Sequence, residues 1–381
     1  MREGDARTRY DPIHVPARHR RHVKQHRDRA RRSGGPVLRW SAVKGSGLLV
    51  LEPILVPKPW GGRRLEGLGK PLPGHLPAGT TYGESWEVAD LPDDALMASA
   101  TGRTLVASGP HRGKSLRRLI AESGSELLGS ASPTSAGDFP LLLKLLDTAE
   151  HLSIQVHPDE EYAGRRREWF SKTESWYVLD ADPGAAIFMG FRPGVTFEEI
   201  RAAAGTPAMA GLLRRVPVKR GDFHHLPAGT VHALGAGVTV AEVQTPSDTT
   251  FRLYDWTEEY RRPERLLHVE DALEALVTGH RPIHSTPAAD SAGSRILVVT
   301  PRYWIREHCL AAGDRAALVR EPELRILMVT SGSVSVGNGK APLSGVPAGG
   351  TTLIPAGSAL SAVVTPEEAT TLLEIGLVPA G

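Results

Sequence analysis

Gly221-Asp222-Phe223-His224-His225-Leu226-Pro227-Ala228-Gly229-Thr230-Val231-His232 is the stretch of this chain that specifies the fold most closely. It consists of a glycine, five residues, a proline, one residue, a glycine, two residues and a histidine. The first glycine and the proline–glycine turn flank a short strand, because these residues supply the backbone conformations that tight turns need. The turn directs His232 inward. We therefore expect a β-fold with an imidazole facing its interior.

A second stretch begins at Ser153 and reads Ser-Ile-Gln-Val-His-Pro-Asp. In a strand the side chains alternate between faces, so Ser153, Gln155 and His157 project to one side and the aliphatic residues between them to the other. Together with Glu174 and His232, Gln155 and His157 would supply two nitrogen and two oxygen ligands. That set suits Zn²⁺ and does not exclude iron or manganese. We predict one such ion per chain, bound by these four residues.

The motifs, taken in order, closely resemble those of type I mannose-6-phosphate isomerases, which belong to the cupin superfamily of small β-barrels. The resemblance rests on four stretches of the sequence: Gln155–Asp159, Lys172–Tyr177, Gly221–His232 and Ser247–Trp256. It runs from about Leu51 to Trp256 in motif order and continues more loosely to the C-terminus. The first cupin motif usually has a His-x-His pair shortly before a glutamate. Here Gln155 replaces the first histidine, and a charged segment separates the second histidine from the glutamate. These two departures limit the cupin families that the chain resembles.

Forty glycines and thirty prolines, with few long helical patterns, indicate a turn-rich, mainly β protein. The resemblance implies two cupin-like jelly-roll β-barrels, with a small helical excursion in the first. We expect a catalytic metal-binding domain over 47–280 with short helices at about 112–124 and 196–214, a linker over 281–294, and a C-terminal cupin-like domain over 295–381. In that last domain Gly350–Gly357 echoes the Gly221 motif, but Leu360 stands where the histidine would be, so we expect no metal there.

The N-terminal segment is strongly basic. Met1 to Lys44 contains thirteen Lys or Arg and four Asp or Glu, although the net charge of the whole chain is only +2. Its apolar residues are sparse and aperiodic, so we expect residues 1–46 to form a disordered basic tail. Most simply it is a solvated extension. Nonspecific contact with polyanions and organelle targeting are the functional alternatives.

Other compositional features limit location and partners. The only cysteine is Cys309, which excludes an intrachain disulfide and favours a reducing compartment, so we expect a cytoplasmic protein. No apolar run approaches the roughly 20 residues that span a bilayer, and the tail matches no folded nucleic-acid-binding motif. We expect a monomer or homodimer with a small-molecule substrate and neither a membrane nor a specific nucleic-acid partner.

The predicted ligands have a chemical consequence. Two neutral imidazoles, a neutral amide and one carboxylate leave a divalent ion with a net charge of about +1, which remains a competent Lewis acid. Such an ion fits an aldose–ketose isomerisation, in which a proton moves between adjacent carbons through an enediol. The resemblance implies the interconversion of mannose 6-phosphate and fructose 6-phosphate.

An anionic substrate requires local positive charge, because the chain beyond the tail is net negative. Lys144, Lys172 and Arg252 are the candidates: a guanidinium binds an oxyanion or phosphate in bidentate fashion, and a lysine acts as a point charge. In similar enzymes the lysine of the Lys144 stretch faces the substrate, and the motif that contains Arg252 carries a catalytic arginine. We assign catalytic roles to Arg252 and Lys172, and expect Ser153 to hydrogen-bond the phosphate or a sugar hydroxyl.

The reaction also needs a base. Glu242 lies on the alternating strand from Val238 to Gln244, and an inward glutamate shielded from water would have the raised pKa of a proton shuttle. The family places a glutamate at a comparable distance before its arginine. Glu242 is therefore our leading candidate, with a metal-bound water or Lys172 as rivals.

Two other functions fit parts of the pattern. A noncatalytic cupin that binds a sugar or an anion would need no acid–base groups beside a metal, whereas this chain has Glu242, Lys172 and Arg252. A cupin oxygenase would need three histidine ligands to iron, whereas Gln155 occupies one ligand position here. The sequence therefore favours a metal-dependent isomerase.

Overall fold

The structure is a computed structural model, and it describes residues 47–70, 80–91, 102–166, 170–277, 282–286, 293–318, 321–337, 343–359 and 361–379. The expected basic tail, residues 1–46, lies outside this part of the chain. The described residues form mainly antiparallel β-structure, as the composition predicts. No helix among them is long and apolar enough to cross a membrane.

Two sheets form the N-terminal sandwich. The larger, seven-stranded sheet has the order β14-β10-β7-β12-β5-β2-β3. Its strands are β2 (Ile54–Gly62), β3 (Tyr82–Val88), β5 (Leu142–Thr148), β7 (Glu174–Ala181), β10 (Phe223–Leu226), β12 (Val238–Gln244) and β14 (Ile283–Ser285). The facing sheet consists of β13 (Phe251–Tyr254), β6 (Ile154–Val156), β11 (His232–Leu234), β8 (Ala186–Phe191) and β9 (Leu213–Pro217), in that order. Trp176 and Val178 from the first sheet pack with Ile187 and Leu234 from the second, so the core lies between them.

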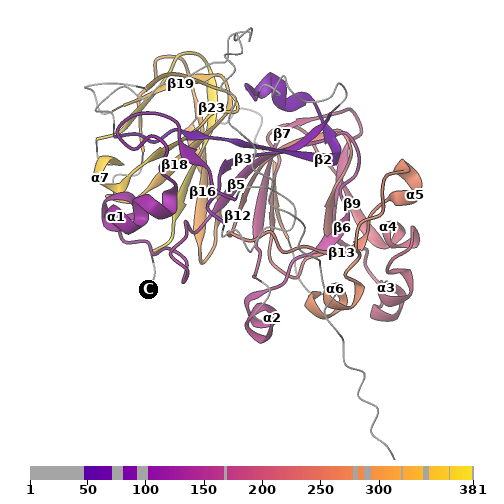
Figure 1. The fold of residues 1–381 in the computed structure, drawn as a ribbon. Helices are drawn as coiled ribbons and strands as arrows, with labels where there is room; N and C mark the ends of the chain where they lie inside the picture. Colours follow the sequence, from indigo (N-terminus) through magenta and orange to yellow (C-terminus); the bar gives the residue numbers. More distant parts are fainter. Residues whose placement is uncertain are drawn as a thin grey trace, which may run out of the picture. The chain divides into compact units, whose positions relative to one another are not determined.

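Helices cover the outer face of the smaller sheet, on the side away from the C-terminal strands (Figure 1). They are α2 (Glu160–Arg165), α3 (Phe197–Ala203), α4 (Ala208–Leu212) and α6 (Val269–Ala275), and α5 (Thr257–Tyr260) follows β13. Local sequence explains their starts. The Asp159 side chain accepts from the Tyr162 backbone N–H, and Thr196 with Glu199 forms a capping box.

The helices differ in extent from the sequence expectation. For the segment expected at about 112–124, α1 spans Leu116–Leu128 and continues past Gly124 through a kink at Ser123. The segment expected at 196–214 contains α3 and α4, and it ends where β9 begins at Leu213. A short 3₁₀ helix, η1 (Arg64–Leu68), and the two-stranded sheet of β1 (Leu51–Glu52) and β4 (Leu105–Val106) complete this half.

The C-terminal sandwich also has two sheets. One has the order β15-β16-β23-β18-β21 and contains β15 (Gly293–Val299), β16 (Tyr303–Leu310), β18 (Arg325–Ser331), β21 (Thr351–Ile354) and β23 (Thr370–Leu377). The other consists of β17 (Ala316–Ala317), β22 (Val363–Pro366), β19 (Ser333–Gly337) and β20 (Leu343–Pro347), in that order. Between β21 and β22 the chain forms the short helix α7 (Ala356–Ala359). Side chains alternate along β18: Leu327 packs toward the four-stranded sheet, and Ile326 packs the other way.

The two sandwiches share one apolar core. Leu143 on β5 and Val243 on β12 belong to the same buried cluster as Tyr303, Ile305 and other residues of the C-terminal five-stranded sheet. The seven-stranded sheet therefore packs one face inside its own sandwich and the other against the C-terminal sheet. Within the segment expected as a linker, 281–294, β14 pairs with β10 as an edge strand of the seven-stranded sheet.

Candidate metal centre

Four side chains from the two N-terminal sheets meet inside the sandwich. Gln155 on β6 and His232 on β11 are directly opposed in the register of the smaller sheet, so their side chains share one face. His157 directly follows β6, and Glu174 is the first residue of β7 on the seven-stranded sheet. All four side chains are buried. The facing sheets thus bring the predicted ligand residues to one place.

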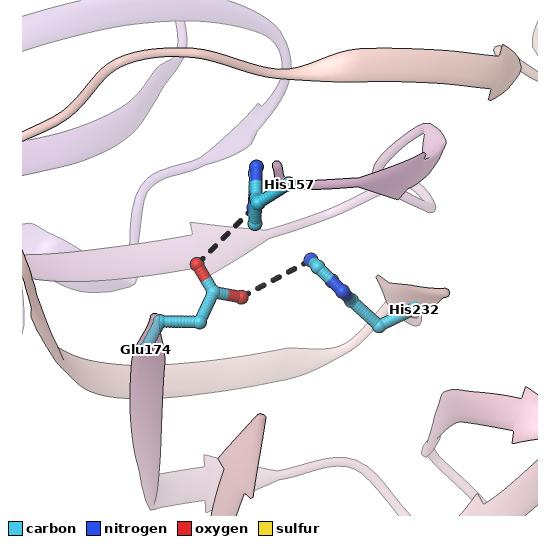
Figure 2. A group of neighbouring side chains, drawn as sticks. All are labelled: His157, Glu174 and His232. Atoms are coloured by element: carbon cyan, nitrogen blue, oxygen red, sulfur yellow. Dashed lines mark ion pairs between the residues drawn. The ribbon is translucent and has the colours of Figure 1, made fainter. Parts of the chain in front are cut away.

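Each oxygen of the Glu174 carboxylate faces one of the two imidazoles, as Figure 2 shows. Its Oε2 is 3.3 Å from His157 Nε2, and its Oε1 is 3.1 Å from His232 Nε2. One ligand atom from each of the three residues lies within 4.8 Å of the others. Trp176 packs edge-on against the His232 ring, with the ring centroids 5.4 Å apart. This compact arrangement is the size of a coordination sphere.

Hydrogen bonds on the far side of each ring determine which nitrogen is available. His157 Nδ1 is 2.8 Å from the Thr249 carbonyl and His232 Nδ1 is 2.8 Å from the Thr230 carbonyl, so each Nδ1–H donates outward. Burial, assisted by Lys172, lowers the pKa of His157 to about 3, so this ring is neutral at pH 7. In a neutral ring with Nδ1 protonated, Nε2 carries a lone pair. Lone pairs that converge with a carboxylate fit a divalent cation.

Gln155 lies where a ligand is expected, but its amide nitrogen, and not its oxygen, faces the His232 imidazole. Its Nε2 faces His232 Nε2 at 3.2 Å, and its Oε1 accepts from Ser153 Oγ at 3.1 Å. Rotation of the amide by half a turn would exchange the two atoms and direct the oxygen toward the imidazole. Ser153 thus lies beside the predicted ligand residues, and its hydroxyl donates a hydrogen bond to one of them, Gln155.

Lys172 is in direct contact with the ligand residues. It precedes β7, and its Nζ lies 2.8 Å from Glu174 Oε2 and 3.1 Å from His157 Nε2. The side chain is 5% exposed, so this ammonium group faces the centre and is shielded from bulk water. The structure thus places Lys172 beside two of the predicted ligand residues.

Glu242 and Lys144 are paired on neighbouring strands of the same sheet face. The register of β12 and β5 sets Glu242 opposite Lys144, and the register of β12 and β7 sets it opposite Trp176. Lys144 Nζ is 3.6 Å from Glu242 Oε2, and the Trp176 indole N–H donates to Glu242 Oε1 at 3.1 Å. Both charged groups are buried. The structure therefore places this ion pair inside the same sandwich as the predicted ligand residues.

Sequence reasoning missed two further charged residues of this cluster. Glu84 on β3 contacts Lys144 Nζ at 3.7 Å through its Oε2, and its Oε1 lies 3.0 Å from Nζ of Lys58 on β2. The Trp86 indole N–H also donates to Glu84, at 2.6 Å. A signal was present: the strand reads Gly-Glu-Ser-Trp-Glu, and a glutamate two residues from a core tryptophan shares its face.

The carboxylates of the cluster have opposite pKa shifts. Burial raises the pKa of Glu242, and the nearby Glu174 carboxylate adds to this shift while Lys172 and Lys144 oppose it. For Glu84, the effect of burial is outweighed by Lys58 and Lys144, and the pKa falls to about 2. Burial likewise fails to raise the pKa of Glu174, which Lys172 and the two imidazoles hold well below its usual value. Glu242 is thus the carboxylate of this group that most readily accepts a proton.

Arg252 lies on β13, opposite Gln155 in the β13–β6 register. Its guanidinium is only partly exposed, and among the residues that the structure describes its buried Nε has no hydrogen-bond acceptor. Burial and the neighbouring Arg265 lower its pKa. A partly buried guanidinium with an unused donor, one strand from a predicted ligand residue, can bind an anionic group.

The sequence of residues 48–188 matches the family described as the type I phosphomannose isomerase catalytic domain. Over 293 residues the chain is 34% identical to the mannose-6-phosphate isomerase of Streptococcus mutans, an alignment that covers 76% of this chain and 87% of that relative.

Solved structures of mannose 6-phosphate isomerases also resemble this chain in fold. The crystal structure of the mannose 6-phosphate isomerase from Bacillus subtilis aligns with a TM-score of 0.69 and 28% identity, over 86% of this chain and 99% of that chain. A mannose 6-phosphate isomerase solved with bound zinc and yttrium aligns with a TM-score of 0.64 over 87% of this chain and 99% of that one, at 16% identity. At that identity the second likeness concerns the fold alone.

Proposed function

Because this chain belongs to the type I mannose-6-phosphate isomerase family, we infer that it interconverts mannose 6-phosphate and fructose 6-phosphate at the buried metal centre. The observation that carries this proposal is the convergence of His157 Nε2, His232 Nε2 and the Glu174 carboxylate, with both Nδ1 atoms bonded outward. A binding protein would need no lysine and second carboxylate next to such a centre. Lys172 and Glu242 therefore favour catalysis over a noncatalytic cupin.

We propose Zn²⁺ as the ion, held by Gln155, His157, Glu174 and His232. Two imidazoles with mixed oxygen ligands are a common zinc set, and a related isomerase has been solved with zinc. When bound, the ion would act as a Lewis acid on a sugar oxygen and stabilise negative charge that develops there. The backbone carbonyls of Thr249 and Thr230 accept the Nδ1–H of the two rings and fix their orientation. This leaves each Nε2 with a lone pair for the metal and makes it a stronger ligand atom.

Glu242 is our candidate for the carbon acid–base step. Starting from the aldose, its carboxylate removes the proton from C2 while the C1 carbonyl oxygen gains a proton, which gives an enediol. The same carboxyl group then returns a proton to C1 while the C2 hydroxyl loses its proton, which gives the ketose. Burial and the resulting raised pKa support this role, because the group must both take and release a proton.

The cations have separate roles in this proposal. Lys172, whose ammonium group touches Glu174 and His157, would donate to a sugar oxygen beside the ion and assist proton exchange between the two oxygens. Lys144 holds Glu242 in place and offsets the negative charge of the buried carboxylates. Arg252 would bind an anionic oxygen of the substrate through its guanidinium, which includes the unused Nε donor, and Ser153 would hydrogen-bond a sugar hydroxyl or the phosphate.

The test is a coupled assay on mannose 6-phosphate with zinc-loaded protein, chelator-treated protein and treated protein to which zinc is restored. We expect turnover with zinc, loss of at least about a hundredfold in kcat after chelation, and recovery on re-addition. The absence of turnover in protein shown by metal analysis to hold one zinc per chain would overturn the isomerase function.

A second arm of the same assay uses Arg252→Ala. We expect kcat to fall by about a hundredfold with zinc content unchanged, because the guanidinium contacts substrate and not metal. Arg252→Lys is the matched variant: it keeps the charge without the bidentate geometry and should recover part of the rate. An unchanged rate in Arg252→Ala would assign this residue to structure.

We also propose that the enzyme works in the cytoplasm, since its one cysteine, Cys309, is a free thiol. Every site residue named above comes from one chain, so either a monomer or a homodimer would hold a complete site.

A further inference from the structure

A tyrosine of the C-terminal sandwich reaches the back of the strands that carry two site carboxylates. This residue, Tyr303, is the first of β16, and it is fully buried in the cluster between the two sandwiches. We propose that Tyr303 is a positioning residue for the isomerase site, which holds β7 and β12 at the register that sets Glu174 and Glu242. The proposal rests on the function inferred above.

A chain of three hydrogen bonds, two of them made by the Tyr303 hydroxyl, connects Tyr303 to three strands of the seven-stranded sheet. The hydroxyl donates to the Val243 carbonyl on β12 at 3.3 Å, and its oxygen lies 2.9 Å from Ser175 Oγ on β7. Ser175 Oγ is in turn 2.9 Å from His225 Nδ1 on β10. The Ser175 hydroxyl thus lies between Tyr303 and His225 and links the two side chains.

These partners form one rung of the sheet. Val243 is opposite Ser175 in the register of β12 and β7, and His225 is opposite Ser175 in the register of β10 and β7. One hydroxyl chain thus fixes three adjacent strands at a single level. A shift of one strand relative to the others would break it.

The site carboxylates lie one residue before this rung. Glu174 precedes Ser175 on β7, and Glu242 precedes Val243 on β12. Because side chains alternate along a strand, both carboxylates project from the opposite face into the N-terminal sandwich. A small backbone shift at the rung therefore displaces the carboxylate ligand and the base candidate relative to each other.

Water cannot replace the tyrosine hydroxyl without rearrangement. Tyr303 is 0% exposed and Ser175 is 1% exposed. Loss of the hydroxyl would remove one hydrogen-bond partner from the Val243 carbonyl and one from the Ser175 hydroxyl, in an interface that excludes water. This loss costs free energy, and the strands can recover part of it by shifting to new hydrogen-bond partners. The interface itself should persist, because the apolar cluster remains and Tyr177 Oη still donates to Glu307 Oε1 at 2.7 Å.

The test is Tyr303→Phe in the zinc-loaded full-length enzyme, beside Tyr162→Phe. Tyr162 is also buried and also loses one hydroxyl hydrogen bond, the 2.6 Å bond to Asp271, but it lies on α2 at the outer face of the smaller sheet. We expect Tyr303→Phe to lower kcat by about five- to tenfold and to shift the acidic limb of the kcat–pH profile, with KM within about twofold and zinc content unchanged. Tyr162→Phe should lower the melting temperature only.

Ser175→Ala provides a second route to the same contact, and it applies even if Tyr303→Phe fails to fold. It removes the partner of Tyr303 and should lower kcat and shift the pH profile in the same way. The double variant should lose no more than the larger single loss, because both changes break one hydrogen-bond chain. Wild-type kcat and an unshifted pH profile in either folded single variant, while the parent enzyme is active, would overturn the positioning role and leave the isomerase function intact.

Discussion

The chemistry proposed for this chain depends on buried carboxylates that are kept in different protonation equilibria. Glu174 lies against an ammonium group and two imidazoles, which favour its ionised form, whereas burial dominates at Glu242. Opposite pKa shifts in neighbouring acids commonly separate a ligand from a proton shuttle. The division of labour proposed here therefore follows from the charges that surround each carboxylate, and not from residue type.

The raised pKa of Glu242 predicts the acidic limb of the rate profile. A base works in its ionised form, so kcat should fall as the pH drops through the pKa of Glu242, and the midpoint should lie above 4.5, the ordinary glutamate value. The relevant quantity is kcat of the zinc-loaded enzyme, because the free substrate phosphate itself titrates near pH ~6.

Glu242→Gln keeps the shape of the side chain and the indole hydrogen bond but cannot accept a proton. It should lower kcat by about a thousandfold across the pH range with zinc content retained. A midpoint at or below 4.5 in the parent enzyme, or substantial activity in Glu242→Gln, would transfer the role of base to another group.

At the level of single residues, the sequence is most informative where the signal is local. His157 and His232 are recognisable from turn and strand spacing, and the structure brings both to Glu174. Glu84 was not identified as a site residue, because its contact with Lys144 depends on the pairing of β3 with β5. Tyr303 lay further beyond reach, since its partners are set by the packing of one sheet on another and leave no periodic pattern in the sequence.

At the scale of elements, the Pro-Ala-Gly turn between β10 and β11 connects the two sheets of the N-terminal sandwich. Gly229 has φ +82°, and its N–H donates to the His157 carbonyl at 2.7 Å. The turn therefore positions His232, which follows it, and also contacts the backbone of His157, the other proposed histidine ligand. The sequence predicted this turn and its direction, but not its bond to His157, which depends on the pairing of β6 with β11.

A substitution of Gly229 tests the role of this turn. In Gly229→Ala the new Cβ would lie 2.6 Å from Val277 Cγ2 in addition to the left-handed backbone strain, so we expect a loss of about 2–4 kcal/mol in the free energy of unfolding and weaker zinc binding. Gly184→Ala is the matched control: its φ is +81°, and a Cβ there meets nothing within 4 Å. It should cost about 1 kcal/mol, with zinc affinity unchanged. Equal effects of the two variants in urea unfolding and zinc titration would contradict a special role for Gly229.

At the scale of the molecule, the seven-stranded sheet is a layer shared by the two sandwiches: it belongs to the N-terminal one and packs against the C-terminal one. One of its faces carries Glu174 and Glu242, and the other packs against the C-terminal sheet through residues such as Leu143 and Val243. The catalytic side of the sheet therefore depends on a sandwich that supplies none of the proposed ligands. The strand pattern and the family resemblance predicted the C-terminal sandwich, but they could not show that its sheet covers the back of the site.

Two truncations test this dependence. A chain that ends at Thr286 would expose the back face of β5, β7 and β12, and each uncovered leucine or valine costs about 1.5–3 kcal/mol, against a total stability of about 5–15 kcal/mol for a typical domain. We expect this variant to lose cooperative thermal unfolding and isomerase activity.

Removal of residues 1–44 takes away only chain that precedes the first described residue, Gly47, so kcat and the melting temperature should stay at the full-length values. Because the apolar cluster includes Leu49, the N-terminal cut must leave that residue in place. A soluble, active chain without the C-terminal strands would contradict the shared-layer argument, and an inactive chain without residues 1–44 would show that the basic segment contributes to the enzyme.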